Sequence, residues 1–230
     1  MYDIVFISYK EPYAETNFKD LYDRFNQVGV FGDRIKHIKN ITGIHNAHFS
    51  AANLVSTSYF FAVDGDAVIQ DDFDFNFITD KKDHVFVYKS INPINDLIYG
   101  YGGVKLLPTK LTKNMNLDST DMTTSISQNF EVIDKIANIT MFNTDPFNTW
   151  KSAFRECAKL ASKTIRRQED EETEQGLKTW TTVGHDRPFG EYALAGATAG
   201  MEFGLSGGSD LRLINDFEWL KSQFDQPTKT

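Results

Sequence analysis

The clearest feature of the hydrophobic pattern is an apolar run, Tyr59-Phe60-Phe61-Ala62-Val63, followed at once by Asp64-Gly65-Asp66. A run without polar interruption predicts a strand buried on both faces, as in the middle of a parallel sheet. Asp64-Gly65-Asp66 predicts the turn that ends this strand and places two carboxylates where open α/β sheets bind their ligands. Gly65 would let the backbone bend so that both acids approach one point.

Strands and helices alternate in the first third of the chain. Strands are expected at 3–9, 34–41 and 59–63, and helices at about 16–25 (with Thr16 as N-cap) and 44–55. This β-α-β-α-β order predicts an α/β fold with a doubly wound, mostly parallel sheet flanked by helices. Ser8-Tyr9 and Asp64-Asp66 would then share the carboxyl edge of one sheet.

The remaining two thirds predict further strands and then a helical C-terminal third. Strands are expected at 84–89, 98–107 (interrupted by glycines) and 136–142, with a short helix at 108–115. Asp145-Pro146 predicts a helix start, with Asp145 as N-cap and Pro146 at the first helical position. Asn215-Asp216 could cap a last helix. We expect a single domain, 1–230, with a nucleotide-binding half (1–107) and an acceptor-side, helical half (108–230).

Charge and composition narrow the classes of function. The chain has 230 residues and a net charge of −8, which argues against a positive coat for non-specific nucleic-acid binding and leaves room for a local basic groove. The single Cys157 fits a reducing compartment. Neither a signal peptide nor a membrane span is evident, so we expect a cytoplasmic location and no membrane partner.

The paired carboxylates are the main candidate for chemistry. Asp64 and Asp66 suit a hard divalent cation, Mg²⁺ or Mn²⁺, that keeps positions for water and substrate phosphates. An Asp-Gly turn that only closes a strand is the alternative. His45 and His48 lie three apart on a predicted helix and could meet at a metal, or could serve as a cap and a core residue.

Taken together, the opening strand into Ser8-Tyr9, Asp64-Gly65-Asp66 after an apolar strand, and the later Tyr101-Gly102-Gly103-Val104 resemble the GT-A type of glycosyltransferase. The resemblance implies a nucleotide-sugar site formed by Ser8, Tyr9, Glu11, Asp64, Gly65, Asp66, Gly102 and Gly103. It also implies Mn²⁺ or Mg²⁺ ligated by Asp66, by Asp64 directly or through water, and by His185 as third ligand. A uridine diphosphate donor is the commonest in this class.

The catalytic base of an inverting transfer should be a carboxylate beside the acceptor hydroxyl. The resemblance favours Asp145, which opens a helix after a predicted strand; Glu191 is the rival and Asp121 the third candidate. A retaining enzyme needs no dedicated base. Tyr99, Tyr101 and Trp150 could stack on a sugar or base, although Trp150 also fits a helix core.

The short chain is also similar to small glycosyltransferases encoded by tailed bacteriophages. That similarity implies a hydroxymethylated base of phage DNA as a possible acceptor and the host cytoplasm as location. Two other functions stay open. One is a nucleotidyltransferase of related fold, which Tyr9-Lys10-Glu11-Pro12 disfavours because such enzymes usually carry a basic, glycine-rich loop there. The other is a non-enzymatic cation- or carbohydrate-binding module.

Overall fold

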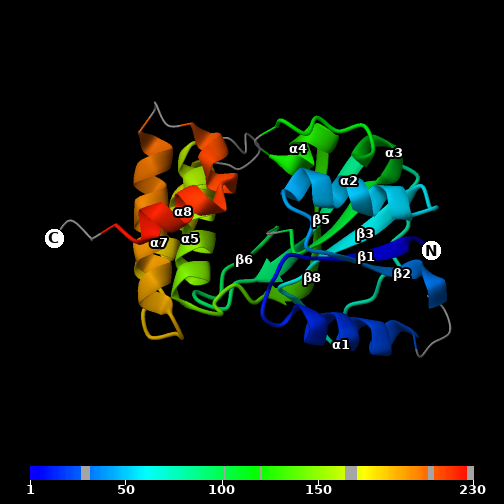
Figure 1. Cartoon of the computed structure of the whole chain (residues 1–230), viewed down its shortest axis with the longest axis horizontal. Helices are drawn as coiled ribbons and strands as arrows, with labels where there is room; N and C mark the ends of the chain where they lie inside the picture. Colours follow the sequence, from blue (N-terminus) through cyan, green and yellow to red (C-terminus); the bar gives the residue numbers. More distant parts are fainter. Residues whose placement is uncertain (27–31, 101, 120, 164–169, 207–209, 227–230) are drawn as a thin grey trace. The chain divides into compact units, whose positions relative to one another are not determined.

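The computed structural model describes residues 1–26, 32–100, 102–119, 121–163, 170–206 and 210–226 (Figure 1). The chain divides into two compact units: unit 1 is Met1–Ile91 with Ile98–Met141, and unit 2 is Asn92–Leu97 with Phe142–Thr230. The division between residues 141 and 142 falls later than the 107/108 boundary that we expected inside one domain, because the long strand β8 belongs to the sheet of unit 1. That both units form a single domain stays a prediction.

Unit 1 is built on one sheet with strand order β2-β1-β3-β7-β5-β8-β4, and β6 pairs with β5. The strands are β1 (Asp3–Ser8), β2 (Ile35–Lys39), β3 (Tyr59–Asp64), β4 (Ala67–Ile69), β5 (His84–Ile91), β6 (Ile98–Tyr99), β7 (Val104–Pro108) and β8 (Asn129–Thr140). β1 is parallel to β2 and β3, as predicted, and β5 is parallel to β8. β7 runs antiparallel to β3 and β5, β4 antiparallel to β8, and β6 antiparallel to β5. The α/β class is therefore confirmed, and the sheet is mixed rather than mostly parallel.

The central strands contribute side chains to two apolar layers. One layer contains Ile4, Phe6, Phe61 and Leu21, the last from α1 (Ala14–Asn26); the other contains Val5, Phe60, Ala62 and Ala51, the last from α2 (Ile44–Leu54). Figure 1 shows α1 on one face of the sheet and α2, α3 (Thr109–Thr112) and α4 (Met122–Ile126) on the other. Because both faces are covered, the residues of β3 can be apolar without alternation.

Several element boundaries differ from the prediction. The first helix begins at Ala14, so Thr16 lies inside it and is not its N-cap. β8 begins at Asn129 and not at 136, because its first half carries polar and partly exposed residues that hide the strand pattern. β4 and α4 are too short to give a periodic signal. The segment predicted as a strand at 98–107, which glycines interrupt, forms two separate strands, β6 and β7.

Unit 2 is helical, as predicted for the C-terminal third. Its helices are α5 (Pro146–Ala161), α6 (Asp170–Thr182), α7 (Gly190–Leu205), the 3₁₀ helix η2 (Leu211–Asn215) and α8 (Phe217–Phe224). Asp145 caps α5 by accepting a hydrogen bond from the Asn148 amide, with Pro146 in its first turn, and Asp216 caps α8; both caps are confirmed. None of the described helices is both long enough and apolar enough to cross a bilayer.

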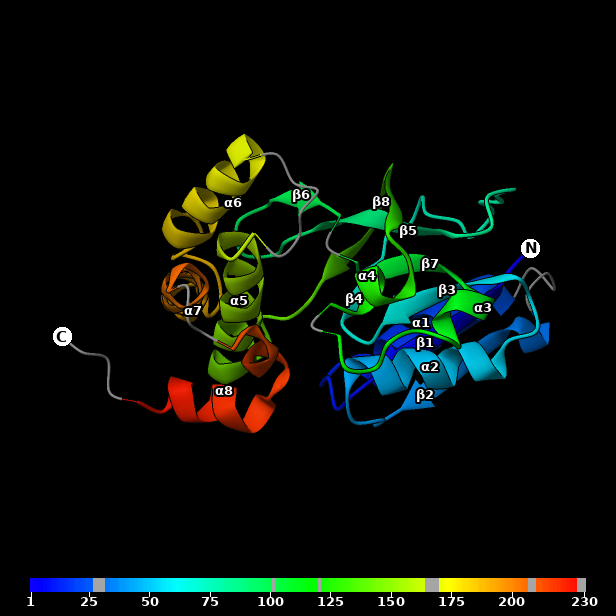
Figure 2. The same cartoon turned by 90° about the horizontal axis from the view of Figure 1, so that it is seen from above.

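Helices α5 and α7 lie side by side (Figure 2) and approach very closely. A Cβ added to Gly196 or Gly200 would lie 2.2 Å from the carbonyl oxygen of Trp150 or Phe154, respectively. Trp150 itself is buried and stacks on Phe154 with ring centroids 4.9 Å apart. Of the two interpretations of Trp150, the structure supports the core residue.

Candidate active site at the carboxyl edge of the sheet

The ends of β1 and β3 lie next to each other, as the parallel order predicts. Ile7 is paired with Asp64 in the register of the two strands. After β1 the chain turns through Tyr9, whose amide donates to Glu11 Oε2 at 2.5 Å. The Glu11 carboxylate lies against Gly65, since a Cβ there would be 2.6 Å from Glu11 Oε2 and 3.0 Å from the Ser8 Cβ. One edge of the sheet therefore brings together Ser8, Tyr9, Glu11, Gly65 and the two aspartates that flank Gly65.

Gly65 has a different role from the one that the sequence predicts. Its φ is not in the left-handed region, so the turn does not depend on glycine for its backbone conformation. Glycine is needed instead for the close approach of Glu11. The Gly65 carbonyl also accepts a hydrogen bond from Asn17 Nδ2 of α1 at 3.0 Å, which fixes this peptide from the opposite side.

Asp64 is paired with a buried lysine. Lys105 of β7 lies opposite Ala62 of β3, and side chains two apart on a strand share a face, so Lys105 projects on the same face as Asp64. Its Nζ lies 3.0 Å from Asp64 Oδ1 and 2.8 Å from Oδ2. Lys105 is 5 % exposed, and such burial of a lysine requires a partner of this kind.

His48 of α2 lies close to this ion pair. Burial and the Lys105 charge lower the pKa of His48 to about 4, against a smaller opposing effect of Asp64. Its Nδ1 hydrogen-bonds the Ile44 carbonyl at 2.8 Å, and its Nε2 is buried with no hydrogen-bond partner among the described residues. His48 is thus a neutral imidazole that adds no charge to the site.

Asp66 is the most perturbed carboxylate of the edge. Burial, followed by the neighbouring charges of Asp64 and Glu11, raises the pKa of Asp66 to about 7. Its backbone carbonyl accepts a hydrogen bond from Met141 at 2.8 Å, so the turn is tied to the end of β8. Three acidic side chains therefore repel one another here, with Lys105 as a compensating cation.

The Gly102-Gly103 segment lies beside this turn. The Gly103 carbonyl accepts from the Asp64 amide at 2.9 Å, and Gly102 has a left-handed φ of 90° and lies against the Lys105 side chain. A Cβ on Gly103 would be 2.4 Å from Asn138 Nδ2. Asn138 is fully buried, accepts from Ser90 Oγ at 2.8 Å and donates to Thr140 Oγ1 at 2.9 Å. This network holds the glycine segment in place.

Ser8 also makes hydrogen bonds on the β2 side of β1, opposite to β3. Its Oγ is 2.9 Å from His37 Nε2, and its carbonyl accepts from the Asn40 amide at 2.8 Å. Burial, followed by the Lys39 charge, lowers the pKa of His37. The Ser8 hydroxyl is therefore bound to β2 rather than directed freely into solvent.

The edge fits a cation that is held jointly with a substrate. Within the described ranges, no group of three or more His, Cys, Asp or Glu side chains is arranged to hold a metal ion by itself. Mg²⁺ commonly uses only one or two carboxylates, together with phosphate oxygens and water. Asp66, with its raised pKa, and Asp64 supply that donor set, and a divalent cation would relieve their repulsion.

The other predicted site residues belong to other elements of the chain. His185 is exposed on the loop before α7, Glu191 is exposed in the first turn of that helix, and Asp145 caps α5; all three belong to unit 2, and their roles stay predictions. Asp121 is the N-cap of α4, accepting from the Thr124 amide. Tyr101 lies outside the described residues.

Four side chains of this edge were missed by the sequence reasoning: Lys105 as the partner of Asp64, His48 as its neighbour, Asn17 and Asn138. Lys105 did carry a signal, because a lysine in the apolar strand Val104–Pro108 needs a buried carboxylate. Which carboxylate it meets depends on the antiparallel register of β7, which no local pattern reveals. His45 and His48 are both buried on α2, and burial lowers the pKa of His45 as well.

Three solved structures resemble this chain at low sequence identity. No protein-family model matches the chain, and no curated protein matches it. A glycosyltransferase involved in the glycosylation of the major capsid of PBCV-1 is 14 % identical over 57 % of this chain and 82 % of its own, with a TM-score of 0.39. The mannosyltransferase PcManGT from Pyrobaculum calidifontis, solved with GDP-Man and Mn²⁺, is 10 % identical over 98 % of this chain and 88 % of its own, with a TM-score of 0.44.

A third solved structure is the bifunctional IspDF from Campylobacter jejuni, with 14 % identity, a TM-score of 0.36, and coverage of 57 % of this chain and 49 % of its own. All three TM-scores lie below 0.5, so none of these likenesses carries weight for the function. The case for a function rests on the carboxyl edge of the sheet.

Proposed function

We propose that this chain transfers a sugar from a nucleoside-diphosphate sugar to an acceptor hydroxyl with the help of a divalent cation. The observation that carries the proposal is the convergence of Asp64, Asp66 and Glu11 at the carboxyl edge of β1 and β3, where burial and mutual repulsion raise the pKa of Asp66 to about 7. Such an edge is a common ligand site of open α/β sheets, and clustered carboxylates with a perturbed pKa favour a functional site.

In this proposal the residues take the roles that the resemblance to GT-A glycosyltransferases implies. Ser8, Tyr9 and Glu11 face the nucleobase and ribose, and Lys105 orients Asp64. Gly102 and Gly103 border the donor through their backbone. Asp66 holds the cation, with Asp64 assisting and His185 as third ligand. Bound Mn²⁺ or Mg²⁺ would bridge the diphosphate and stabilise the leaving group.

The finer parts of the proposal follow from the resemblance to GT-A glycosyltransferases. The donor is a uridine diphosphate sugar, and the base of an inverting transfer is Asp145 or Glu191. The acceptor is a hydroxymethylated base of phage DNA, with the reaction in the host cytoplasm. With a net charge of −8, binding to DNA would require basic side chains gathered on one face.

The test is an assay of the purified chain with a panel of nucleotide sugars and Mn²⁺, in which the released nucleotide is identified. Sugar transfer releases a nucleoside diphosphate, whereas a nucleotidyltransferase given a nucleoside triphosphate and a sugar phosphate releases pyrophosphate. Asp66→Ala should reduce release at least about 100-fold, because it removes the proposed cation ligand. Cation binding in the presence of uridine diphosphate, followed by Mn²⁺ electron paramagnetic resonance, should be lost in the same variant.

Asp20→Ala is the matched control, since Asp20 is an exposed aspartate of α1 in the same unit. It should leave release and Mn²⁺ binding unchanged. Near-normal turnover in Asp66→Ala would contradict the proposed metal-dependent reaction. Mn²⁺ binding by the unmodified chain without turnover of any donor would indicate a binding module.

A further inference from the structure

A cavity of about 710 Å³ lies at the end of β3 opposite to Asp64. Its lining comes from three segments of unit 1: Ser56–Tyr59, which leads into β3, 79–82, which precedes β5, and α3 with Lys113. Because β3 spans six residues at about 3.3 Å each, this cavity is separated from the carboxyl edge by roughly 17 Å. It is therefore distinct from the candidate active site.

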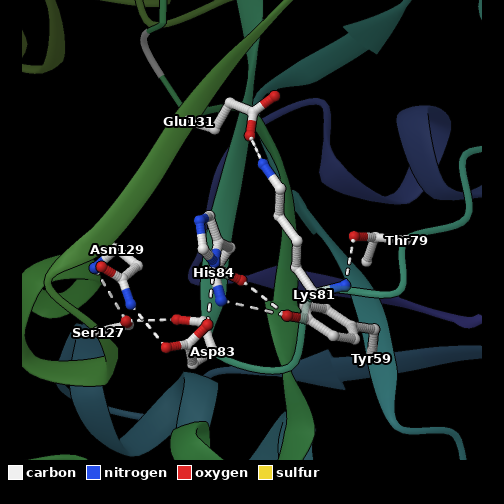
Figure 3. A network of polar contacts seen from close by, with 8 residues as sticks. All are labelled: Tyr59, Thr79, Lys81, Asp83, His84, Ser127, Asn129 and Glu131. Carbon is white, nitrogen blue, oxygen red and sulfur yellow. Dashed lines mark hydrogen bonds and ion pairs between the residues drawn. The ribbon is translucent and has the colours of Figure 1, made fainter.

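The wall of this cavity is held by hydrogen bonds that are already made. Thr109 Oγ1 donates to the Thr57 carbonyl at 2.7 Å, and Thr57 Oγ1 donates to the Tyr59 carbonyl at 2.6 Å. The Tyr59 hydroxyl donates to the His84 carbonyl at 3.1 Å and accepts from its amide at 3.2 Å (Figure 3). The wall is thus rigid before any ligand arrives, which lowers the entropic cost of binding.

The charges around the cavity are unbalanced. Four lysines and one aspartate, Asp80, line it. The charge of the Lys81 ammonium is balanced by an ion pair with Glu131 (Figure 3). The side-chain ammonium groups of Lys82, Lys110 and Lys113 have no hydrogen bond, ion pair or ring contact in the described ranges, a condition that only Lys178 shares among the described lysines. Of these four described lysines, three border one cavity.

We propose that this cavity binds a small molecule that carries a phosphate or diphosphate group. Lysine ammonium groups bind phosphate as point charges, and the hydroxyls of Ser56 and Ser58, which also line the cavity, add uncharged donors. A volume of this size is typical of sites for small ligands. A divalent cation would be repelled by the lysines. The proposal does not depend on sugar transfer at the other edge.

The test is a calorimetric titration of pyrophosphate into the metal-free chain. The cavity variant Lys82→Gln/Lys110→Gln/Lys113→Gln should bind at least about 10-fold more weakly than the unmodified chain, because three charge-assisted contacts are lost. The control Lys19→Gln/Lys163→Gln/Lys221→Gln changes the net charge equally. It removes exposed ion pairs and the cation-π contacts of Lys221 with Phe147 and Phe224, none of which borders the cavity, so its affinity should change less than about 3-fold. Equal loss in both variants, or no loss in the cavity variant, overturns the proposal.

Further titrations identify the ligand and its place. If uridine diphosphate binds through the cavity lysines, the ligand of the cavity is a nucleotide. If pyrophosphate binds more tightly than uridine diphosphate, the cavity recognises the diphosphate group alone. Both outcomes support the site. Asp66→Ala should bind pyrophosphate as the unmodified chain does, and loss of binding there would place the anion at the other edge and overturn the proposal. Duplex DNA that binds through these lysines while pyrophosphate does not would also overturn it.

Discussion

At the scale of single residues, the face of the sheet under α2 concentrates charge in an apolar layer. Lys105 and Asp64 form an ion pair whose lysine is buried, and His48 lies beside it as a neutral imidazole. Burial and the Lys105 charge keep His48 neutral. The stability of unit 1 should therefore depend on pH through two opposing contributions: His48, whose pKa is lowered by folding, and Asp66, whose pKa is raised by it.

His48 gives the pH prediction. Its pKa is 6.5 in the unfolded chain and about 4 in the fold, so protons bind the unfolded chain preferentially between these values. The stability that His48 contributes is fully present above pH 6.5 and is lost as pH falls through 4. Between pH 7 and pH 5 this loss should be about 2 kcal/mol of unfolding free energy. Asp66 contributes in the opposite direction over the same range, so chemical denaturation measures the His48 contribution as a difference between the unmodified chain and a His48 variant.

Between pH 7 and pH 5 the unfolding free energy of His48→Gln should fall by about 2 kcal/mol less than that of the unmodified chain, whatever its stability at neutral pH, because glutamine does not titrate. His185→Gln is the control, since His185 is exposed, and it should keep the original slope. If the slopes of His48→Gln and the unmodified chain coincide, the buried neutral state of His48 is wrong.

Asp145 and Glu191 can be separated by their structural roles. Asp145→Asn retains a residue that caps helices as well as aspartate does, so the stability of α5 should barely change. If Asp145 is the base of the proposed transfer, the chemical step should fall about 100-fold or more while donor binding stays unchanged. Single-turnover rates and nucleotide titration measure the two effects.

Glu191→Gln serves as the comparison, because Glu191 is exposed in the first turn of α7 and its loss should not disturb packing. A loss of rate in this variant alone would assign the base to Glu191. Unchanged rates in both variants would remove both carboxylates from the reaction and favour a transfer without a dedicated base.

At the scale of elements, local chemistry decided which parts of the fold were predictable. The start of α5 followed from Asp145-Pro146, because a cap and a helix-compatible proline act within one turn. The buried β3 followed from its apolar run. The first half of β8 did not, since its pairing with β5 passes through register shifts around Lys89 and it carries polar residues. Its strand conformation comes from its neighbour rather than from its own sequence.

The packing of α5 on α7 gives a prediction about stability. Gly200→Ala would place a Cβ 2.2 Å from the Phe154 carbonyl oxygen, so the two helices would have to separate. This should destabilise the chain by about 1–3 kcal/mol, as overpacking of a tight interface does. Thermal and denaturant unfolding measure the change.

Gly176→Ala in α6 is the control for the same chemical change. The nearest atom to its added Cβ is Leu160 Cδ1 at 3.9 Å, so the methyl group finds space. Alanine should stabilise this helix by about 0.5–1 kcal/mol. We therefore expect Gly200→Ala to lower the free energy of unfolding and Gly176→Ala to raise it. Stabilisation by Gly200→Ala would mean that α5 and α7 do not pack as closely as described.

At the scale of the whole molecule, the sequence predicted the edge where the candidate site lies but not everything that surrounds it. Parallel strands bring their carboxyl ends together, so Ser8, Glu11, Asp64 and Asp66 could be grouped from their order alone. The partner of Asp64 and the lysine-lined cavity depend on the antiparallel β7 and on loops whose course no local pattern specifies. That Asn92–Leu97 belongs to unit 2 was not predicted either, because this segment looks like an ordinary turn in the sequence.

That short segment has a consequence for the order of synthesis. Asn92–Leu97 belongs to unit 2, where Ile94 is 1 % exposed, Gly184 lies against its carbonyl, and Asp96 pairs with Arg187 at 2.7 Å. The ribosome adds Ile94 to the chain about ninety residues before Gly184. At a synthesis rate of roughly 5–20 residues per second, this is an interval of about 5–18 seconds. Throughout that interval a large apolar side chain has no packing partner from the 184–190 loop. The nascent chain therefore passes through a stage in which chaperones can bind it, and that stage ends only when the 184–190 loop emerges.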